Sequence, residues 1–308
     1  MIVQGAYIGQ FKNYMPYNSR IKSLNLHLLF FSYFLLTVLK VGAQTHSPSI
    51  YANIEYGEVS GHKLLMDIYE PNGPGPFPVA IYVHGGGWTG GDKAHTADLP
   101  ALEMLSEAGF AWFSINYRLA PEHRWPSCLN DIQTAIRWVK ANAENYKGDP
   151  SKIVLIGYSA GGHLASYAAT VLDESTTVQA VVALAPLTDF VQELPKRGNI
   201  LGKAQRGLLN RPQELTAESL GMLKALSPIN YIRPGLPPFL LVHGNADQSV
   251  PYEQSLLFQT QLKNNDVHCD LITIPGAPHR LTEWNKHLPN YNSQVIAWIK
   301  ATLATPPN

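Results

Sequence analysis

The sequence predicts an α/β fold in which helices cover both faces of a mostly parallel, eight-stranded sheet. Short apolar runs of strand length alternate with longer stretches of helical pattern from residue 44 to the C-terminus. Several runs end directly in glycine-rich turns, as residues 79–83 do before three consecutive glycines. Parallel strands need crossover connections, and these place helices on both faces of the sheet.

The strands are expected in two groups. Strands at about 54–59 and 63–69 precede a turn rich in proline and glycine at 71–78, and we expect them to pair antiparallel at one sheet edge. Six buried strands then follow, at about 79–83, 111–116, 153–156, 179–184, 238–242 and 269–274.

Helices are expected between these strands, at about 99–108, 128–145, 160–172, 252–264 and 281–303. An insertion at about 191–233 carries a further helical pattern near 214–225. We expect this insertion to lie over the strand ends as a small lid.

The pentapeptide Gly-Tyr-Ser-Ala-Gly at 157–161 is the strongest chemical signal in the chain. It follows the apolar run 152–156 and opens a helical stretch of small residues. Glycines on both sides of a serine relieve crowding in a sharp strand-to-helix turn and leave the hydroxyl exposed. A serine after a strand is also a common helix N-cap, but the context favours Ser159 as a covalent nucleophile.

A second glycine-rich strand exit lies upstream, in the segment His-Gly-Gly-Gly-Trp at 84–88. Successive glycines let backbone N–H groups converge on a developing oxyanion. Gly86 and Gly87 are therefore predicted oxyanion donors, with the N–H of Ala160 as a third. The alternative is an ordinary glycine turn.

The C-terminal third supplies a base and an acid after two strands. Asp247 lies on the loop that follows the strand at 238–242, and His279 follows the strand at 269–274. The order Ser159, Asp247, His279 is the order expected when a serine nucleophile is activated on this architecture. Asp189, which follows the strand at 179–184, is the rival acid.

Most of the other histidines have structural interpretations. His84 is positioned to support the glycine loop by hydrogen bonding, and His163 to pack on the helix after Ser159. His243 precedes a strand-end glycine and is interpreted as structural. His123 lies in a loop flanked by prolines, where it could touch substrate.

These motifs resemble those of HGGG-type esterases in the α/β-hydrolase superfamily, over about residues 53–303. The resemblance rests on the segments at 84–88, 90–93, 116–123, 157–165, 227–228 and 243–251. Within that group, Trp88, the Gly-Asp-Lys at 91–93 and Tyr158 are similar to the bifunctional feruloyl and acetyl-xylan esterase branch. The Tyr-Arg-Leu-Ala-Pro-Glu-His stretch at 117–123 is similar to hormone-sensitive-lipase-like esterases, which usually carry Asp in place of Tyr158.

The resemblance implies an α/β-hydrolase fold and a serine carboxylesterase that needs no metal or organic cofactor. Its expected substrates are acetyl or feruloyl esters of plant polysaccharide, or small esters. Trp88 is expected beside the acyl group, with His84 and Tyr158 as further substrate contacts; alternatively, Trp88 packs beneath the lid. A serine exopeptidase and a non-catalytic adhesion module on the same fold are the alternative functions.

Composition excludes some partners and adds little else. The formal net charge is zero, and basic residues are spread along the chain, so no nucleic-acid partner is expected. The two cysteines, Cys128 and Cys269, are too few for a disulfide scaffold and form no metal-ligand pattern, so both are expected as buried free thiols.

Residues 1–43 are expected to form an N-terminal extension with a secretory signal, leaving 44–308 as the catalytic domain. Arg20 and Lys22 precede an apolar run at 26–39, and small residues at 41–43 suit cleavage. An uncleaved anchor is the alternative, and Met15 is a possible start. The predicted location is secreted or periplasmic, with membrane contact only during export.

Overall fold

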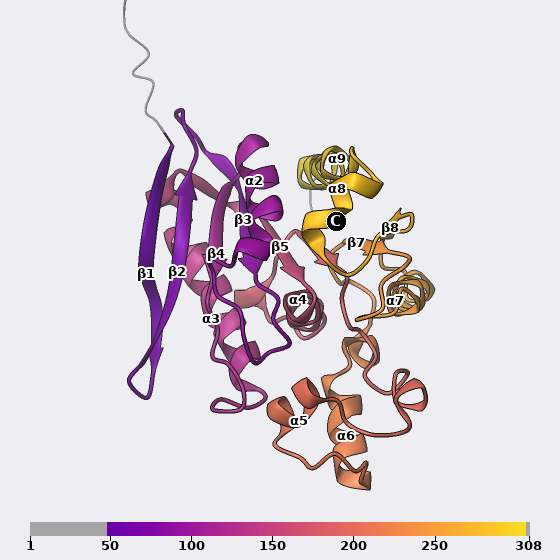
Figure 1. Cartoon of the computed structure of the whole chain (residues 1–308). Coiled ribbons are helices and arrows are strands. Elements are labelled where there is room, and N and C mark those ends of the chain that lie inside the picture. The colour runs from indigo at the N-terminus through magenta and orange to yellow at the C-terminus, as the bar shows by residue number, and fades with distance from the viewer. Residues whose placement is uncertain (1–47, 306–308) are drawn as a thin grey trace, which may run out of the picture. The chain divides into compact units, whose positions relative to one another are not determined.

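The computed structural model describes residues 48–305 and contains the predicted sheet. The eight strands lie in the order β1-β2-β4-β3-β5-β6-β7-β8 (Figure 1). Both β1 and β4 pair antiparallel with β2, and every other pairing is parallel. The strands are β1 (Ser49–Val59), β2 (His62–Glu70), β3 (Phe77–Val83), β4 (Ala111–Ile115), β5 (Gly148–Tyr158), β6 (Ala180–Leu184), β7 (Phe239–Gly244) and β8 (Cys269–Ile274).

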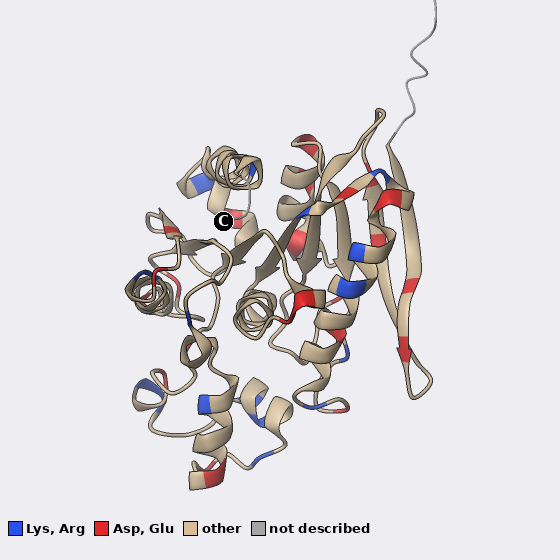
Figure 2. Ribbon diagram, turned by 180° about the vertical axis from the view of Figure 1, so that it is seen from behind, with Lys and Arg blue, Asp and Glu red and all other residues tan. Residues whose placement is uncertain are grey.

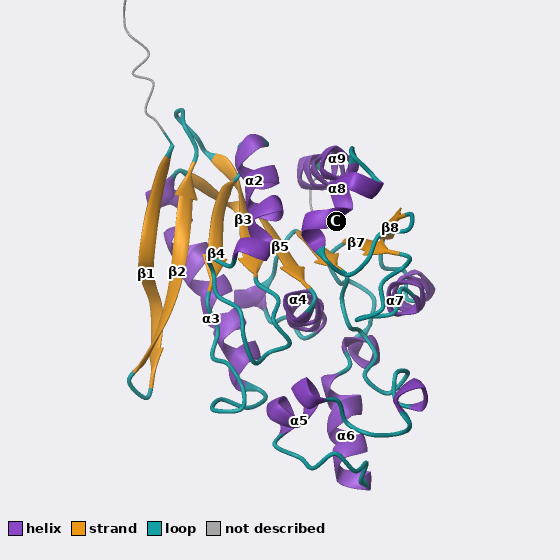
Figure 3. Cartoon of the chain, in the orientation of Figure 1, coloured by secondary structure: helices purple, strands orange, loops and turns teal. Residues whose placement is uncertain are grey.

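Two hydrophobic cores lie on opposite faces of the sheet, because successive side chains of a strand point to opposite sides. In β3, Ile81 and Val83 belong to one core, whereas Ala80 and Tyr82 belong to the other. Helices cover both faces, as Figure 3 shows. This arrangement explains why β3 and β6 are apolar on both faces.

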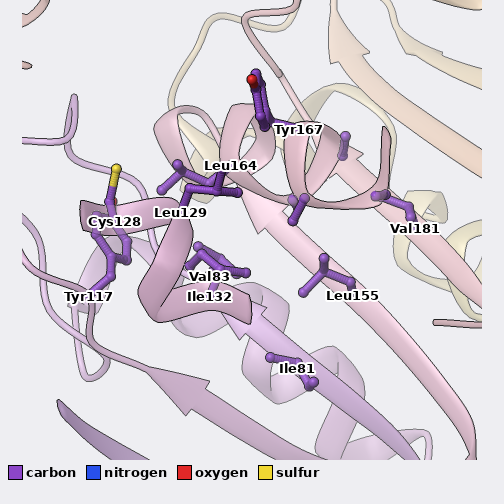
Figure 4. Packing of buried hydrophobic residues seen from close by; sticks show 14 of the residues in the cluster. Ile81, Val83, Tyr117, Cys128, Leu129, Ile132, Leu155, Leu164, Tyr167 and Val181 are labelled. Carbon is purple, nitrogen blue, oxygen red and sulfur yellow. The ribbon is translucent and has the colours of Figure 1, made fainter. Parts of the chain in front are cut away.

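The first core lies under α3 (Ser127–Asn142), α4 (Ala160–Thr170) and α7 (Glu253–Asn264). Leu129 and Ile132 of α3 and Leu164 of α4 pack against the strand residues (Figure 4). Cys128 and Cys269 are both buried and free, as expected. Their burial raises the pKa of each thiol to about 12.

The second core lies under α2 (Leu99–Glu107), α8 (Trp284–His287) and α9 (Tyr291–Ala304). The single helix predicted at 281–303 is wrong. The segment instead forms a 3-10 turn, η6 (Leu281–Glu283), followed by α8 and α9 as separate helices. Pro289 lies in the break, where its ring would clash with a continuing helix and its nitrogen could donate no hydrogen bond.

The insertion at 191–233 is helical, with α6 (Ala217–Leu226) where the helical pattern was found and α5 (Lys203–Leu209) in addition. It contacts α4 and the glycine loop, and also α7, where Gln254 bonds the side chains of Gln192 and Glu193. The Tyr167 hydroxyl donates to the Ala225 carbonyl at 2.9 Å, and a Cβ on Gly87 would lie 3.4 Å from that of Ala204. The remaining 3-10 turns are η1 (Thr96–Asp98), η2 (Ala143–Tyr146), η3 (Glu174–Thr176), η4 (Pro195–Arg197) and η5 (Pro228–Tyr231).

Charged residues of both signs are interspersed over the described elements (Figure 2). Between residues 48 and 305, each helix is too short or too polar to cross a bilayer. The predicted secretory signal at 1–43 lies outside the described residues.

Candidate active site

The predicted site residues gather where the strand order reverses. From β3 the chain moves to β4 on one side, whereas β5 lies on the other side of β3 and leads on to β6. Ligands of open α/β sheets bind outside the carboxyl ends of the strands at such a reversal. The glycine loop leaves β3 and Ser159 leaves β5, so both lie at this point.

Close backbone packing fixes the turn at Ser159. Its φ of +54° is rare for a residue with a side chain. A Cβ on Gly157 would lie 2.1 Å from the Gly161 carbonyl oxygen, and a Cβ on Gly161 would lie 2.0 Å from that of Val83. Only glycine fits at either position, and this packing holds the serine at the start of α4.

Ser159, His279 and Asp247 form one hydrogen-bonded chain. His279 Nε2 lies 2.9 Å from Ser159 Oγ, and its Nδ1 lies 2.6 Å from Asp247 Oδ2. A histidine held by a carboxylate at Nδ1 presents an unprotonated Nε2 to the serine hydroxyl. The arrangement can therefore accept the serine proton.

Asp247 is held by more groups than sequence reasoning indicated. Its Oδ1 accepts hydrogen bonds from the backbone N–H groups of Ser249 (2.8 Å) and Val250 (2.9 Å). Its Oδ2 lies 3.2 Å from Nε2 of the buried His243 as well as against His279. Burial alone would raise the pKa of this carboxyl, but the hydrogen bonds from His243 and His279, the charge of His279 and the Val250 N–H together lower it well below its usual range.

His243, which the sequence suggests is structural, contacts the acid directly. Its Nε2 is also 3.0 Å from the Val250 carbonyl oxygen, while its Nδ1 lies 2.7 Å from the Ser255 hydroxyl. A neutral ring with the proton on Nε2 satisfies all these partners, since the serine then donates to Nδ1. His243 lies in β7 and Asp247 on the loop that follows it, so no sequence signal predicts this contact.

The rival acid, Asp189, has a different role. Its Oδ1 accepts from the N–H groups of Val191 (2.8 Å) and Gln192 (3.1 Å), and so closes a turn. Its neighbour in this region is Gln254, whose side chain bonds the backbone of Asp189. The geometry places Asp247, and not Asp189, against His279.

A cavity of about 690 Å³ opens in front of the serine, and its lining includes Gly86, Gly87, Tyr158, Ser159 and His279. Gly86 and Gly87 have φ values of +119° and +60°, which glycine adopts without strain.

Ala160 is the first residue of α4, so its N–H has no acceptor within the helix. Ala160 directly follows the serine in the chain, and Gly86 and Gly87 line the same cavity as Ser159.

Tyr158 lines this cavity but also supports the base. Its hydroxyl donates to the His279 carbonyl oxygen at 2.7 Å, and the two rings stack with centroids 5.3 Å apart. Burial raises the pKa of this phenol, so it remains a donor at neutral pH. The residue before the nucleophile thus fixes the loop that carries His279.

Trp88 does not lie beside the acyl group as expected. The residue is 5% exposed, and its indole N–H donates to His163 Nδ1 at 3.0 Å. Its ring packs on Phe190, at 5.4 Å between centroids. The φ of Trp88, +61°, turns the side chain away from the cavity and into the core, a direction that the sequence alone does not specify.

His84 is also buried, at 1% exposure, so the expected substrate contact is wrong for this residue as well. Its Nδ1 donates to the Gly85 carbonyl oxygen at 2.6 Å, which supports the glycine loop, and burial lowers the pKa of the ring to about 4. Behind the same loop, burial raises the pKa of Asp98 to about 6, although its Oδ2 accepts from the Gly85 N–H.

The other histidines of the sequence analysis are placed as follows. His163 is buried and bonds Trp88 and the Leu226 carbonyl oxygen, so it packs as predicted. His123 stacks edge-on against His62, with ring centroids 5.0 Å apart. In residues 48–305, no three His, Cys, Asp or Glu side chains are grouped so as to bind a metal ion.

The chain is similar to known esterases over about two thirds of its length. The BD-FAE family matches residues 66–262. Two proteins of Mycobacterium tuberculosis are similar: the probable carboxylic ester hydrolase LipM, 35% identical over 68% of this chain, and Esterase LipC, 33% identical over 66%. The chain spans about half the length of these relatives, 51% and 53% respectively.

A solved structure is also similar to this chain. A truncated carbohydrate esterase from gut microbiota has a TM-score of 0.72 and 25% identity, with 85% of this chain and 99% of that chain covered. The parallel sheet, the glycine loop after β3 and the serine turn after β5 have the arrangement of the α/β-hydrolase fold. The chain therefore belongs to the BD-FAE family, among the HGGG-type esterases of the α/β-hydrolase superfamily.

Proposed function

We propose that this protein is a serine carboxylesterase in which Ser159, His279 and Asp247 form the catalytic triad. The observation that carries the proposal is the continuous hydrogen-bonded chain from Ser159 Oγ through His279 to Asp247 at the edge of an open cavity. The family and the esterase relatives support the same reaction class.

In the first half-reaction, Ser159 Oγ attacks the ester carbonyl carbon while its proton passes to His279 Nε2. Asp247 stabilises the resulting imidazolium. The carbonyl oxygen becomes an oxyanion, which the N–H groups of Gly86, Gly87 and Ala160 are proposed to bind. When this tetrahedral intermediate collapses, the bond between the carbonyl carbon and the alkoxy oxygen breaks. His279 gives the proton to the departing alcohol.

In the second half-reaction, water attacks the acyl-serine carbon and gives its proton to His279 Nε2. The C–O bond to Ser159 then breaks, the serine regains the proton, and the carboxylic acid leaves. No redox step occurs, and this chain's own residues supply every proton transfer.

We further propose that the substrates are acetyl or feruloyl esters on plant polysaccharide, or related small esters. The similarity of the fold to a carbohydrate esterase from gut microbiota supports this class. Export, which the pattern at 26–43 predicts, would bring the enzyme to such polymers.

The test combines covalent labelling with ester assays. A fluorophosphonate should label the wild-type protein once at Ser159, and Ser159→Ala should abolish both labelling and hydrolysis of 4-nitrophenyl acetate. Ser166→Ala is the matched control, because this buried serine lies on α4 and its hydroxyl has no partner among the described residues. Full activity in Ser159→Ala contradicts the proposal, and faster hydrolysis of aminoacyl nitroanilides than of esters would assign an exopeptidase instead.

A further inference from the structure

A second cavity, of about 560 Å³, lies beside the one that contains Ser159. The loop at 245–251 separates the two cavities, and the exposed Gln248 lines both. We call the second cavity the insertion groove and define it by Glu193, Lys196, Arg197, Gln248, Tyr252 and Glu253. One wall comes from the insertion and the other from the start of α7, and the groove meets the Ser159 cavity at Gln248.

Glu193 gives the groove a buried carboxylate that can accept further hydrogen bonds. The residue is 3% exposed, and its Oε1 accepts a long hydrogen bond of 3.4 Å from the Gln254 side-chain amide. The same amide nitrogen lies closer to the Asp189 carbonyl oxygen (3.0 Å) and to Gln192 (2.9 Å), and it has only two hydrogens to share. A buried carboxylate requires stronger partners than this, which a ligand hydroxyl in the groove can supply.

Arg197 offers the complementary donors. Its side chain is exposed, and its guanidinium has no hydrogen bond or ion pair within residues 48–305. Lys196, next to it, lies 3.7 Å from Glu253 across the groove. Asp247 also borders the groove, but its side chain is fully buried and paired with His243 and His279. The groove's other charged side chains are two cations and two carboxylates, so their charges balance and a neutral ligand is favoured over an anion or a cation.

The remaining surface suits a sugar ring. A sugar hydroxyl both donates, as Glu193 requires, and accepts, as Arg197 requires. Tyr252 adds an aromatic side chain, which presents apolar area to the C–H face of a ring, and Gln248 adds amide groups at the junction of the two cavities.

We propose that the insertion groove is a carbohydrate subsite that binds a neutral sugar unit of the polysaccharide chain whose ester group lies at Ser159. This inference rests on the proposed esterase function for its biological sense, but sugar binding can be measured without catalysis. The occupant is the alcohol side of the ester, since the acyl carbon must face Ser159 and the oxyanion donors.

The experiment is titration calorimetry of the full-length protein with unacetylated xylotetraose. The wild type should bind it, and Arg197→Ala and the isosteric Glu193→Gln should each weaken binding about tenfold, as loss of one charge-assisted hydrogen bond implies. Arg233→Ala is the matched control, because Arg233 is an exposed arginine at the far end of the insertion that lines neither cavity. Its affinity should stay within twofold of wild type.

Kinetics supply the second readout. The kcat/KM for acetylated xylotetraose should fall about tenfold relative to that for 4-nitrophenyl acetate in Arg197→Ala, through KM. Absence of xylotetraose binding by the wild type, or unchanged affinity in both groove variants, would overturn the subsite. Tighter binding of tetragalacturonate than of xylotetraose would also overturn it.

The two proposals fail separately. Loss of xylotetraose binding in the groove variants supports the subsite even if 4-nitrophenyl acetate is not hydrolysed. A protein that hydrolyses 4-nitrophenyl acetate but binds no xylotetraose keeps the esterase function without the subsite.

Discussion

Replacing Asp247 with asparagine should stop catalysis by changing the tautomer of His279. Asp247 Oδ1 accepts from two backbone N–H groups, at 2.8 and 2.9 Å. An asparagine must keep its oxygen there, because an NH₂ group cannot accept. The NH₂ then faces His279 Nδ1, 2.6 Å away in the wild type, and donates to it. The proton of the imidazole moves to Nε2, which can no longer accept the proton of Ser159.

The expected loss in kcat is about 10⁴-fold, the size known for the same exchange in a serine protease triad. It corresponds to about 5 kcal/mol of transition-state stabilisation. The KM should change little, because the Asp247 side chain is fully buried. Initial rates with 4-nitrophenyl acetate at neutral pH, with circular dichroism as a check on folding, provide the measurement.

Asp189→Asn is a closely matched control. Asp189 also accepts two backbone N–H groups through Oδ1, from residues two and three positions ahead, but it bonds neither His279 nor His243. Its asparagine variant should retain activity within about twofold. An Asp247→Asn enzyme within tenfold of wild type, or an equal loss in both variants, would refute the assigned role of Asp247.

Three further outcomes are expected. Tyr158→Phe keeps the ring stack on His279 but loses the hydroxyl's bond at 2.7 Å, so kcat/KM should fall about two- to tenfold; an unchanged value would mean that the bond does not position the base. Trp88→Ala should lower the free energy of unfolding by about 3–5 kcal/mol in urea denaturation, and altered acyl preference without destabilisation would return Trp88 to the substrate site. Because burial raises the pKa of Asp98 from 3.8 to about 6, its neutral form stabilises the fold below about pH 4, and this contribution is lost as the pH rises through about 6. The stability of Asp98→Asn relative to wild type should therefore increase by about 2–3 kcal/mol from pH 4 to pH 7, and a flat difference in urea denaturation would contradict the assignment.

The features that could be predicted from the sequence have short, local sequence signals. The turn at Ser159 needs glycine for close backbone packing, and such glycines are visible in the sequence itself. The strands before Asp247 and His279 are apolar and end in turns, so the positions of both loops follow from the pattern. The geometric meeting of Ser159, His279 and Asp247 then follows from parallel strands that end at one sheet edge.

The features that the sequence did not indicate depend on the direction of side chains and on contacts in the folded structure. The left-handed backbone of Trp88 turns its ring into the core, and three neighbouring glycines allow many other paths. The contact of His243 with Asp247 crosses a loop, where four-residue spacing has no fixed geometric meaning, unlike on a helix. Pro289 divides the segment predicted as one helix at 281–303, because proline cannot continue a helix.

The close backbone packing around Gly157 and Gly161 has a consequence for changing this protein by engineering. Any side chain at these two positions must displace the Gly161 or Val83 carbonyl, so libraries that vary them would consist mostly of inactive members. Ala246, Gln248 and Ser249 line the same cavity from an exposed loop on a separate part of the chain. Randomising those three positions can therefore search for new substrate preferences while the turn that carries the nucleophile stays in place.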